Sequence, residues 1–174
     1  DKVTTVGGTK HKEDAVAAAS WGSIFIEKTL GDRLTVGVDY VPSALESESS
    51  ETARRDKTTT DAQTVQTNKV QVDFTDLTTL YVALNVTENL YIKAGAMQVD
   101  VETNETLGTG SKYGNSSLDG TLLGIGFDNQ MDNGMFIRLE GNYMDFDGAS
   151  LTSQNKSDNK ISLNSLEGVS GKLS

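Results

Sequence analysis

The feature that most constrains this chain is a period of two in its apolar residues. In the segment MFIRLEGNYMDF (135–146), Ile137 and Leu139 fall on one side of an extended chain, and Arg138 and Glu140 fall on the other. A β-strand points successive side chains to opposite faces, whereas a helix would scatter the same apolar residues around its circumference. The segment is therefore predicted to be a strand with one apolar and one polar face.

The same alternation recurs along the whole chain and predicts an all-β fold. Seven strands are expected near residues 15–29, 34–41, 69–86, 90–101, 120–128, 135–146 and 160–173, and residues 3–6 could supply an eighth. Three connections are tight turns rich in Gly, Asn or Asp, at 30–33, 87–89 and 129–134. The other connections are long and polar, chiefly 42–68, 102–119 and 147–159. Short turns at one end and long loops at the other predict an up-and-down antiparallel barrel that forms a single domain over residues 1–174.

Two stretches fit the alternation less well, and a third fits it with a polar interruption. Val70–Phe74 share the parity of Leu80–Val86, so one register is expected to run through Asp76 and Thr78 despite their polarity. After Met97 the apolar residues change parity, which predicts either a bulge or a change of surroundings at 97–101. No single register fits residues 165–174.

The composition excludes several classes of function. The chain has 15 Lys+Arg against 25 Asp+Glu, a formal net charge of −10, so it is a poor candidate for binding nucleic acid. It contains no Cys and one His, which excludes disulfide scaffolds, thiolate metal sites and His-pair metal sites. We therefore expect no metal site and no cofactor.

Alternation alone does not separate a soluble barrel, with its apolar face inside, from a membrane barrel, with its apolar face toward lipid. The segregation of long and short connections favours the membrane barrel. In that arrangement a polar network is predicted to line the lumen: Glu27, Asp39, Asp73, Lys93, Arg138, Glu140 and Asn142. The opposite parity is predicted to face lipid: Leu34, Val36, Val38, Leu80, Val82, Leu84, Leu123, Ile125, Met135, Ile137 and Leu139. Tyr40, Phe127 and Tyr143 are the expected aromatic residues at the lipid–water interfaces.

Segments such as GSIFIEKTLGDRLTVGVDY, LYVALNVTENLYIKAGAM and GTLLGIGFDNQMDNGMFIRLEGNYMDF resemble the eight-stranded bacterial outer-membrane barrels of the OmpA, OmpX and opacity-protein type. The resemblance implies an eight-stranded transmembrane β-barrel in the bacterial outer membrane. Members of that group carry a signal peptide and usually end in an aromatic residue. This chain shows neither, so its terminal strands are expected to be truncated.

The expected function is non-enzymatic: a structural or anchoring role in the outer-membrane lipid, with recognition of extracellular ligands or surfaces by the long loops. A small channel for small solutes and a soluble lipocalin-like binding barrel remain alternatives. A few barrels of this architecture are enzymes that depend on a His near the rim. His11, in TKHKED, is interpreted instead as a loop residue, so no catalytic residue is expected.

Overall fold

The computed structural model describes residues 2–6, 9–13, 18–42, 45–46, 50–57, 63–106, 112–133, 135–154 and 160–174. In these ranges the ordered elements are all strands, which confirms the all-β prediction. The strands are β1 (Lys2–Val6), β2 (Thr9–Glu13), β3 (Ile24–Leu30), β4 (Leu34–Val41), β5 (Leu45–Glu46), β6 (Ser50–Lys57), β7 (Gln63–Asn85), β8 (Leu90–Thr106), β9 (Ser116–Gln130), β10 (Phe136–Phe146), β11 (Ala149–Thr152), β12 (Lys160–Leu163) and β13 (Leu166–Leu173). The described part of the chain has no helix of the length and apolar character needed to cross a membrane.

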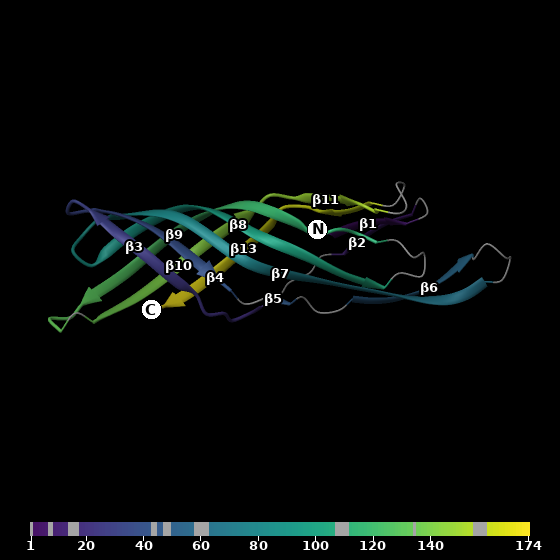
Figure 1. Ribbon diagram of the computed structural model, residues 1–174, viewed down its shortest axis with the longest axis horizontal. Helices are drawn as coiled ribbons and strands as arrows, with labels where there is room; N and C mark the ends of the chain where they lie inside the picture. Colours follow the sequence, from purple (N-terminus) through teal and green to yellow (C-terminus); the bar gives the residue numbers. More distant parts are fainter. Residues whose placement is uncertain are drawn as a thin grey trace.

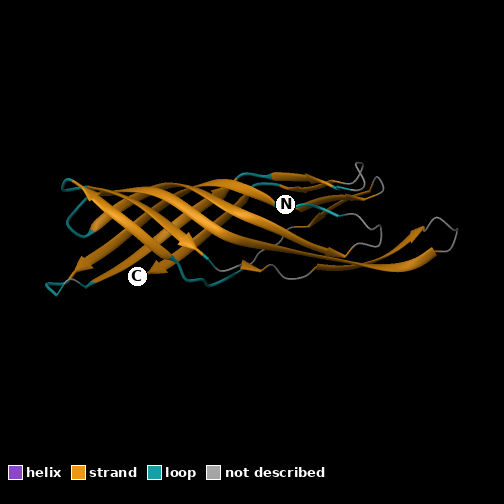
Figure 2. Ribbon diagram, in the orientation of Figure 1, coloured by secondary structure: helices purple, strands orange, loops and turns teal. Residues whose placement is uncertain are grey.

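The main sheet is antiparallel and follows the order β13-β10-β9-β8-β7-β4-β3, with β5 and β6 paired to β7 (Figure 1). Short turns join β3 to β4, β7 to β8 and β9 to β10 at one end of the long axis. At the other end β6, β7 and β8 extend beyond the rest of the sheet (Figure 2). Parts of the expected long loops are thus strands: β6 lies within 42–68, β8 runs on to Thr106, and β11 lies within 147–159. The predicted antiparallel order and the segregation of short turns are present.

The predicted closure into an eight-stranded barrel is wrong for the described residues. The outermost strands, β3 and β13, each pair with one neighbour only. The strand expected as the eighth, β1, belongs instead to a second sheet of order β11-β12-β1-β2. Because β1 and β2 are joined by only two residues, their hairpin closes with a small loss of chain entropy. The expected strand 160–173 is also divided, with β12 in the second sheet and β13 in the main sheet.

Strand β8 shows how the two faces of the main sheet change along its length. Its pairing with β9 is continuous from Leu90 to Val101, so residues 97–101 contain no bulge. Lys93, Met97, Val99 and Val101 are all buried on the same, inner face. The predicted parity change is therefore a change of surroundings, because the inner face turns from charged to apolar while the strand stays regular.

The apolar part of the inner face forms the core of the extended end. Its buried members come from five strands: Val41, Leu77, Met97, Val99, Val101, Leu118, Leu122 and Phe146. Over this core the outward positions of β8 are polar, namely Gln98, Asp100 and Glu102. This half of the sheet therefore has the ordinary arrangement for water, with apolar side chains inside and polar ones outside.

The single register predicted for residues 70–86 is wrong, because β7 contains a β-bulge. The pairing of β7 with β8 shifts between Thr75 and Thr78, and Asp76 has a positive φ of 53°. The bulge reverses the parity, so Phe74 packs against the same core as Leu77. The Tyr40 hydroxyl donates a hydrogen bond to the Asp76 carboxylate and anchors the bulge to β4.

We expect Asp76→Val to lower the free energy of unfolding by about 1–2 kcal/mol, because a β-branched residue is strained at positive φ. The matched control is Thr78→Val, two positions along on the same exposed face, which should change stability by less than about 0.5 kcal/mol. Urea titration monitored by circular dichroism measures both. Equal effects from the two substitutions would show that the bulge backbone is not under conformational constraint.

Candidate functional site

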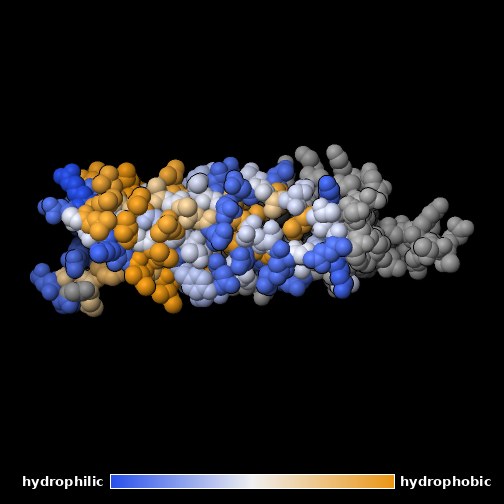
Figure 3. All heavy atoms as spheres, turned by 45° about the horizontal axis from the view of Figure 1, so that its top comes forward, coloured by the Kyte–Doolittle hydropathy of each residue, from blue (hydrophilic) through white to orange (hydrophobic). Residues whose placement is uncertain are grey.

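Exposed apolar side chains lie on the outer face of the main sheet toward the end that carries the short turns, and Figure 3 shows them gathered there on one side of the molecule. We call this set the outer belt. Its members point outward from strands β3, β4, β7, β8, β9, β10 and β13 or, for Met135, from the residue before β10: Ile24, Ile26, Leu34, Val38, Leu80, Val82, Leu84, Ile92, Leu123, Ile125, Phe127, Met135, Ile137, Leu139, Tyr143, Val169 and Leu173. Ile125 is 55% exposed and Leu139 is 60% exposed, values more usual for charged side chains. A continuous apolar band of this kind marks an interaction surface.

The outer belt runs obliquely to the rows of paired residues. One such row passes from β4 to β13 through Val38, Leu80, Ala96, Thr121, Asp145 and Glu167. The row begins with aliphatic residues and ends with acidic ones. A straight boundary can cross a row in this way only if the strands are tilted relative to the belt, as in β-barrels.

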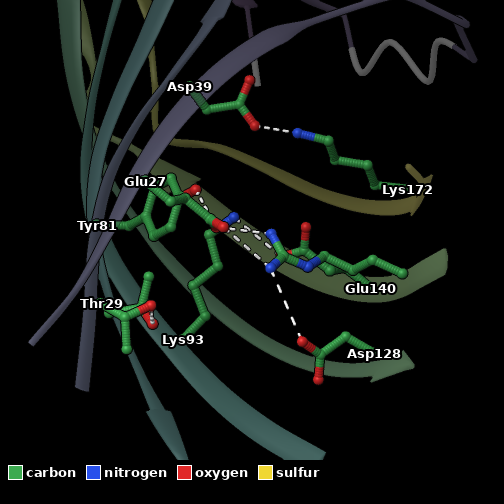
Figure 4. A network of polar contacts seen from close by, with 10 residues as sticks. Glu27, Thr29, Asp39, Tyr81, Lys93, Asp128, Glu140 and Lys172 are labelled. Atoms are coloured by element: carbon green, nitrogen blue, oxygen red, sulfur yellow. Dashed lines mark hydrogen bonds and ion pairs between the residues drawn. The ribbon is translucent and has the colours of Figure 1, made fainter. Parts of the chain in front are cut away.

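Directly beneath the outer belt, the inner face is charged and closely paired (Figure 4). Lys93 Nζ on β8 lies 2.9 Å from Glu140 Oε1 on β10, and the two side chains are 4% and 2% exposed. The ammonium group also lies 3.8 Å from the centroid of the Tyr81 ring. Buried charges are tolerated when they are paired in this way, so Lys93 and Glu140 depend on each other.

Two further ion pairs join strands that are distant in the sheet order. Arg138 on β10 forms a two-pronged interaction with Glu27 on β3, with its Nη1 and Nη2 atoms 2.6 and 3.0 Å from the two carboxylate oxygens. Tyr81 donates a third hydrogen bond to Glu27, at 2.6 Å. Lys172 on β13 pairs with Asp39 on β4. These pairs connect strands near one edge of the sheet, β10 and β13, with strands near the other edge, β3 and β4 (Figure 4).

Glycines on the inner face make room for the larger polar side chains. The Tyr81 ring lies against Gly37 and the Tyr91 ring against Gly126, so that a Cβ added at either glycine would come within 2.6 Å of ring atoms. The Asn142 side chain occupies the space over Gly124 in the same way. These close approaches explain why small residues alternate with charged and aromatic ones on this face.

The structure brings most of the predicted polar residues together and leaves one out. Six of them lie on the inner face: Glu27, Asp39, Lys93, Arg138, Glu140 and Asn142. Asp73 is separate, because the bulge places it on the outer face, where it accepts a hydrogen bond from Asn104 at 2.8 Å. The sequence prediction omitted Lys172, whose inward position follows from the alternation of β13 but lies in the stretch where no register was found.

The residues predicted to face lipid all point outward, although Val36 is only half-exposed. The expected interface aromatics, Tyr40, Phe127 and Tyr143, are 37%, 51% and 42% exposed. His11 lies in β2 rather than in the expected loop, and its side chain falls outside the described residues.

Comparison of the chain with protein-family models, curated proteins and solved structures finds no match. The outer belt and the paired inner face are therefore the features of the chain that bear on its function.

We expect Lys93→Met to lower the free energy of unfolding by about 3–5 kcal/mol, because it leaves Glu140 buried without its partner. Adding Glu140→Met should restore most of that loss, since two apolar side chains of similar volume replace the pair. Chemical denaturation of the two single variants and the double variant gives the coupling energy. Additive losses would show that the two groups do not depend on each other.

Proposed function

We propose that this chain is an outer-membrane β-sheet protein of the barrel type, inserted in lipid through the outer belt. The observation that carries the proposal is the outer belt itself, which covers an inner face of paired charges. Apolar side chains outside and paired polar side chains inside are the reverse of the arrangement that water favours, and they suit a bilayer. Along β10 and the residue before it, the belt runs from Met135 to Tyr143, close to the ~9–11 residues that a tilted strand needs to cross the hydrocarbon layer.

The reversal of the two faces along β8 supports this proposal. Outward positions are apolar from Ile92 to Ala96 and polar from Gln98 to Glu102, while the inward positions change in the opposite sense. The outer face of this one strand therefore suits lipid over residues 92–96 and water over residues 98–102. On β8 we propose the boundary between lipid and water near residues 96–98, in the row of paired residues that includes Thr78 on β7 and Tyr40 on β4.

The extended end supports a role in anchoring and surface recognition. The short turns lie at one end of the sheet, and the described strands that fall within 42–68, 102–119 and 147–159, among them β6, the end of β8 and β11, lie toward the other. In a bacterial outer membrane the longer end faces the exterior. We propose that this end contacts extracellular ligands or surfaces without enzymatic chemistry.

The two alternative functions fit the structure less well. A channel needs a solvated path, but the inner face of the extended end is filled by the apolar core around Val99, Leu118 and Phe146. A soluble binding barrel would turn Leu123, Ile125 and their neighbours inward, whereas these side chains point outward.

We expect Ile125→Arg to reduce the stability of the lipid-inserted protein by about 2–4 kcal/mol, because it places a charge at the level of the hydrocarbon core. The matched control is Ser117→Arg, on the same strand and the same outward face but beyond the belt, with a cost of about 0–1 kcal/mol. Urea titration in phospholipid vesicles, with flotation to measure the inserted fraction, compares the two variants.

Equal tolerance of the two arginines in vesicles would refute insertion through the belt. A second test compares the mobility of unboiled and boiled protein on an SDS gel after extraction in detergent. Membrane β-barrels resist unfolding by SDS until they are boiled, so a shift is expected; a chain that is soluble without detergent and shows no shift would contradict the proposal.

A further inference from the structure

A shallow groove lies within the outer belt, on the outer face of β9, β10 and β13. It is lined by Leu123 and Ile125 on β9, Gly141 and Tyr143 on β10, and Val169 on β13. It offers about 440 Å³ of space, which falls in the range of ~300–1,000 Å³ that small-ligand sites occupy. We call it the glycine groove, because the paired glycines described next leave it open.

Two glycines face each other across β10 and β13 where the belt is otherwise large and apolar. Gly141 is the register partner of Gly171, and a Cβ added at either would meet no atom within 4 Å. The outward positions on either side of them are large: Leu139 and Tyr143 on β10, and Val169 and Leu173 on β13. A glycine inside a strand marks a bulge, a bend or a close approach by a ligand or another backbone. The pairing of β10 with both neighbours is regular here, so the glycines indicate a close approach.

Two carboxylates stand at the end of the glycine groove that faces the extended end of the molecule. Asp145 and Glu167 are the next outward residues beyond Tyr143 and Val169, both are exposed, and they are register partners. Like charges directly opposite each other destabilise an antiparallel pair. None of the ion pairs among the described residues includes either carboxylate. Both act electrostatically on the hydroxyl of Tyr143, which stands between them and the groove.

We propose that the glycine groove binds one phospholipid with a primary ammonium head group, of the phosphatidylethanolamine class. This inference rests on the proposed function, because the outer belt meets lipid only when the chain is inserted. The ammonium group lies against Asp145 and Glu167, and one acyl chain runs past Tyr143 and over Gly141. Four residues separate Asp145 from Gly141, or about 13 Å along the strand, which is less than half of the ~30 Å hydrocarbon layer. An acyl chain of one leaflet therefore spans this distance.

The acidic pair selects the head group. A primary ammonium has three N–H donors, so it can give a charge-assisted hydrogen bond to each of the two carboxylates. The trimethylammonium of phosphatidylcholine carries the same charge but no N–H group. Thr121, the register partner of Asp145 on β9, adds a hydroxyl that can donate to the neighbouring phosphate. The site should therefore prefer ethanolamine to choline when the acyl chains are identical.

The same acidic pair disfavours a second copy of this chain as the occupant. Contact between two copies about a two-fold axis places the same patch of each against the other. Asp145 and Glu167 of one copy would then approach the same two carboxylates of the other, and like charges brought together at an interface cost affinity. A lipid with a cationic head group compensates the carboxylates that a second copy would oppose.

Native mass spectrometry of the full chain in detergent micelles tests the proposal. Phosphatidylethanolamine and phosphatidylcholine with identical acyl chains are added in equal amounts, and we expect several-fold more ethanolamine than choline adducts. Gly171→Leu should reduce the ethanolamine adducts several-fold, because its side chain enters the open space beside Gly141. The matched control is Ala96→Leu on the outward face of β8, which should leave the adducts unchanged. Circular dichroism verifies that both variants are folded.

A second pair of variants tests the head group. Asp145→Asn combined with Glu167→Gln should remove the preference, so that the two lipids bind equally. The control is Asp100→Asn combined with Glu102→Gln, which makes the same change of net charge at outward positions of β8 away from the groove. This control should keep the preference for ethanolamine.

Several outcomes overturn the proposal. Equal binding of the two lipids by the unaltered protein, or the same adducts after Gly171→Leu, would remove the site. A dimer that Gly171→Leu dissociates would assign the groove to a second copy. Loss of the preference in the Asp100 and Glu102 control would show that net charge alone selects the lipid. Failure of the proposed function is seen separately, as equal tolerance of Ile125→Arg and Ser117→Arg in vesicles.

Discussion

The buried ion pair between Lys93 and Glu140 is the interaction on which the short-turn half of the main sheet depends. A lysine and a glutamate that are almost completely buried can remain charged only as partners, so β8 and β10 must hold them within hydrogen-bond distance. Strand β9 lies between these two strands and passes the pair with glycines at positions 124 and 126. Gly124 pairs with Lys93 and Gly126 with Glu140 in the register of the sheet, and the same two glycines leave room for the Asn142 and Tyr91 side chains.

The need to pair charges on the inner face also connects the two edges of the sheet, which are formed by β3 and β13. Arg138 reaches Glu27 and Lys172 reaches Asp39, although each pair joins strands that are not neighbours in the sheet. Side-chain ion pairs thereby bring the edges together where backbone hydrogen bonds do not. A side-chain pair can connect such strands, but it leaves the backbone groups of both edges unpaired. The main sheet therefore has a paired polar inner face while its two edge strands stay unpaired in the described structure.

The chain combines two arrangements of one sheet. Toward the short turns, apolar residues such as Ile125 are outside and charges are inside. Toward the extended end, Leu118 on the same strand is 2% exposed and the outward positions are polar. A regular strand can serve both halves because its side chains alternate between the two faces along its whole length. Only the polarity of the residues on each face changes. This reversal of the two faces along the long axis of the molecule is the physical basis for the proposed function.

The sequence by itself determined the all-β class, the central parts of the main-sheet strands, their antiparallel order and the face on which most of their side chains lie, because a period of two translates directly into the two faces of a strand. It also predicted that Arg138, Glu140 and Lys93 share the polar face. It did not reveal the bulge at Asp76, which moved Asp73 out of the polar network, since one residue at positive φ reverses parity without leaving a clear pattern. Only the tertiary structure decided that β1 joins a second sheet, that Lys172 pairs with Asp39 and that the main sheet stays open. These features depend on which distant strands meet, and alternation along one strand carries no information about its neighbours.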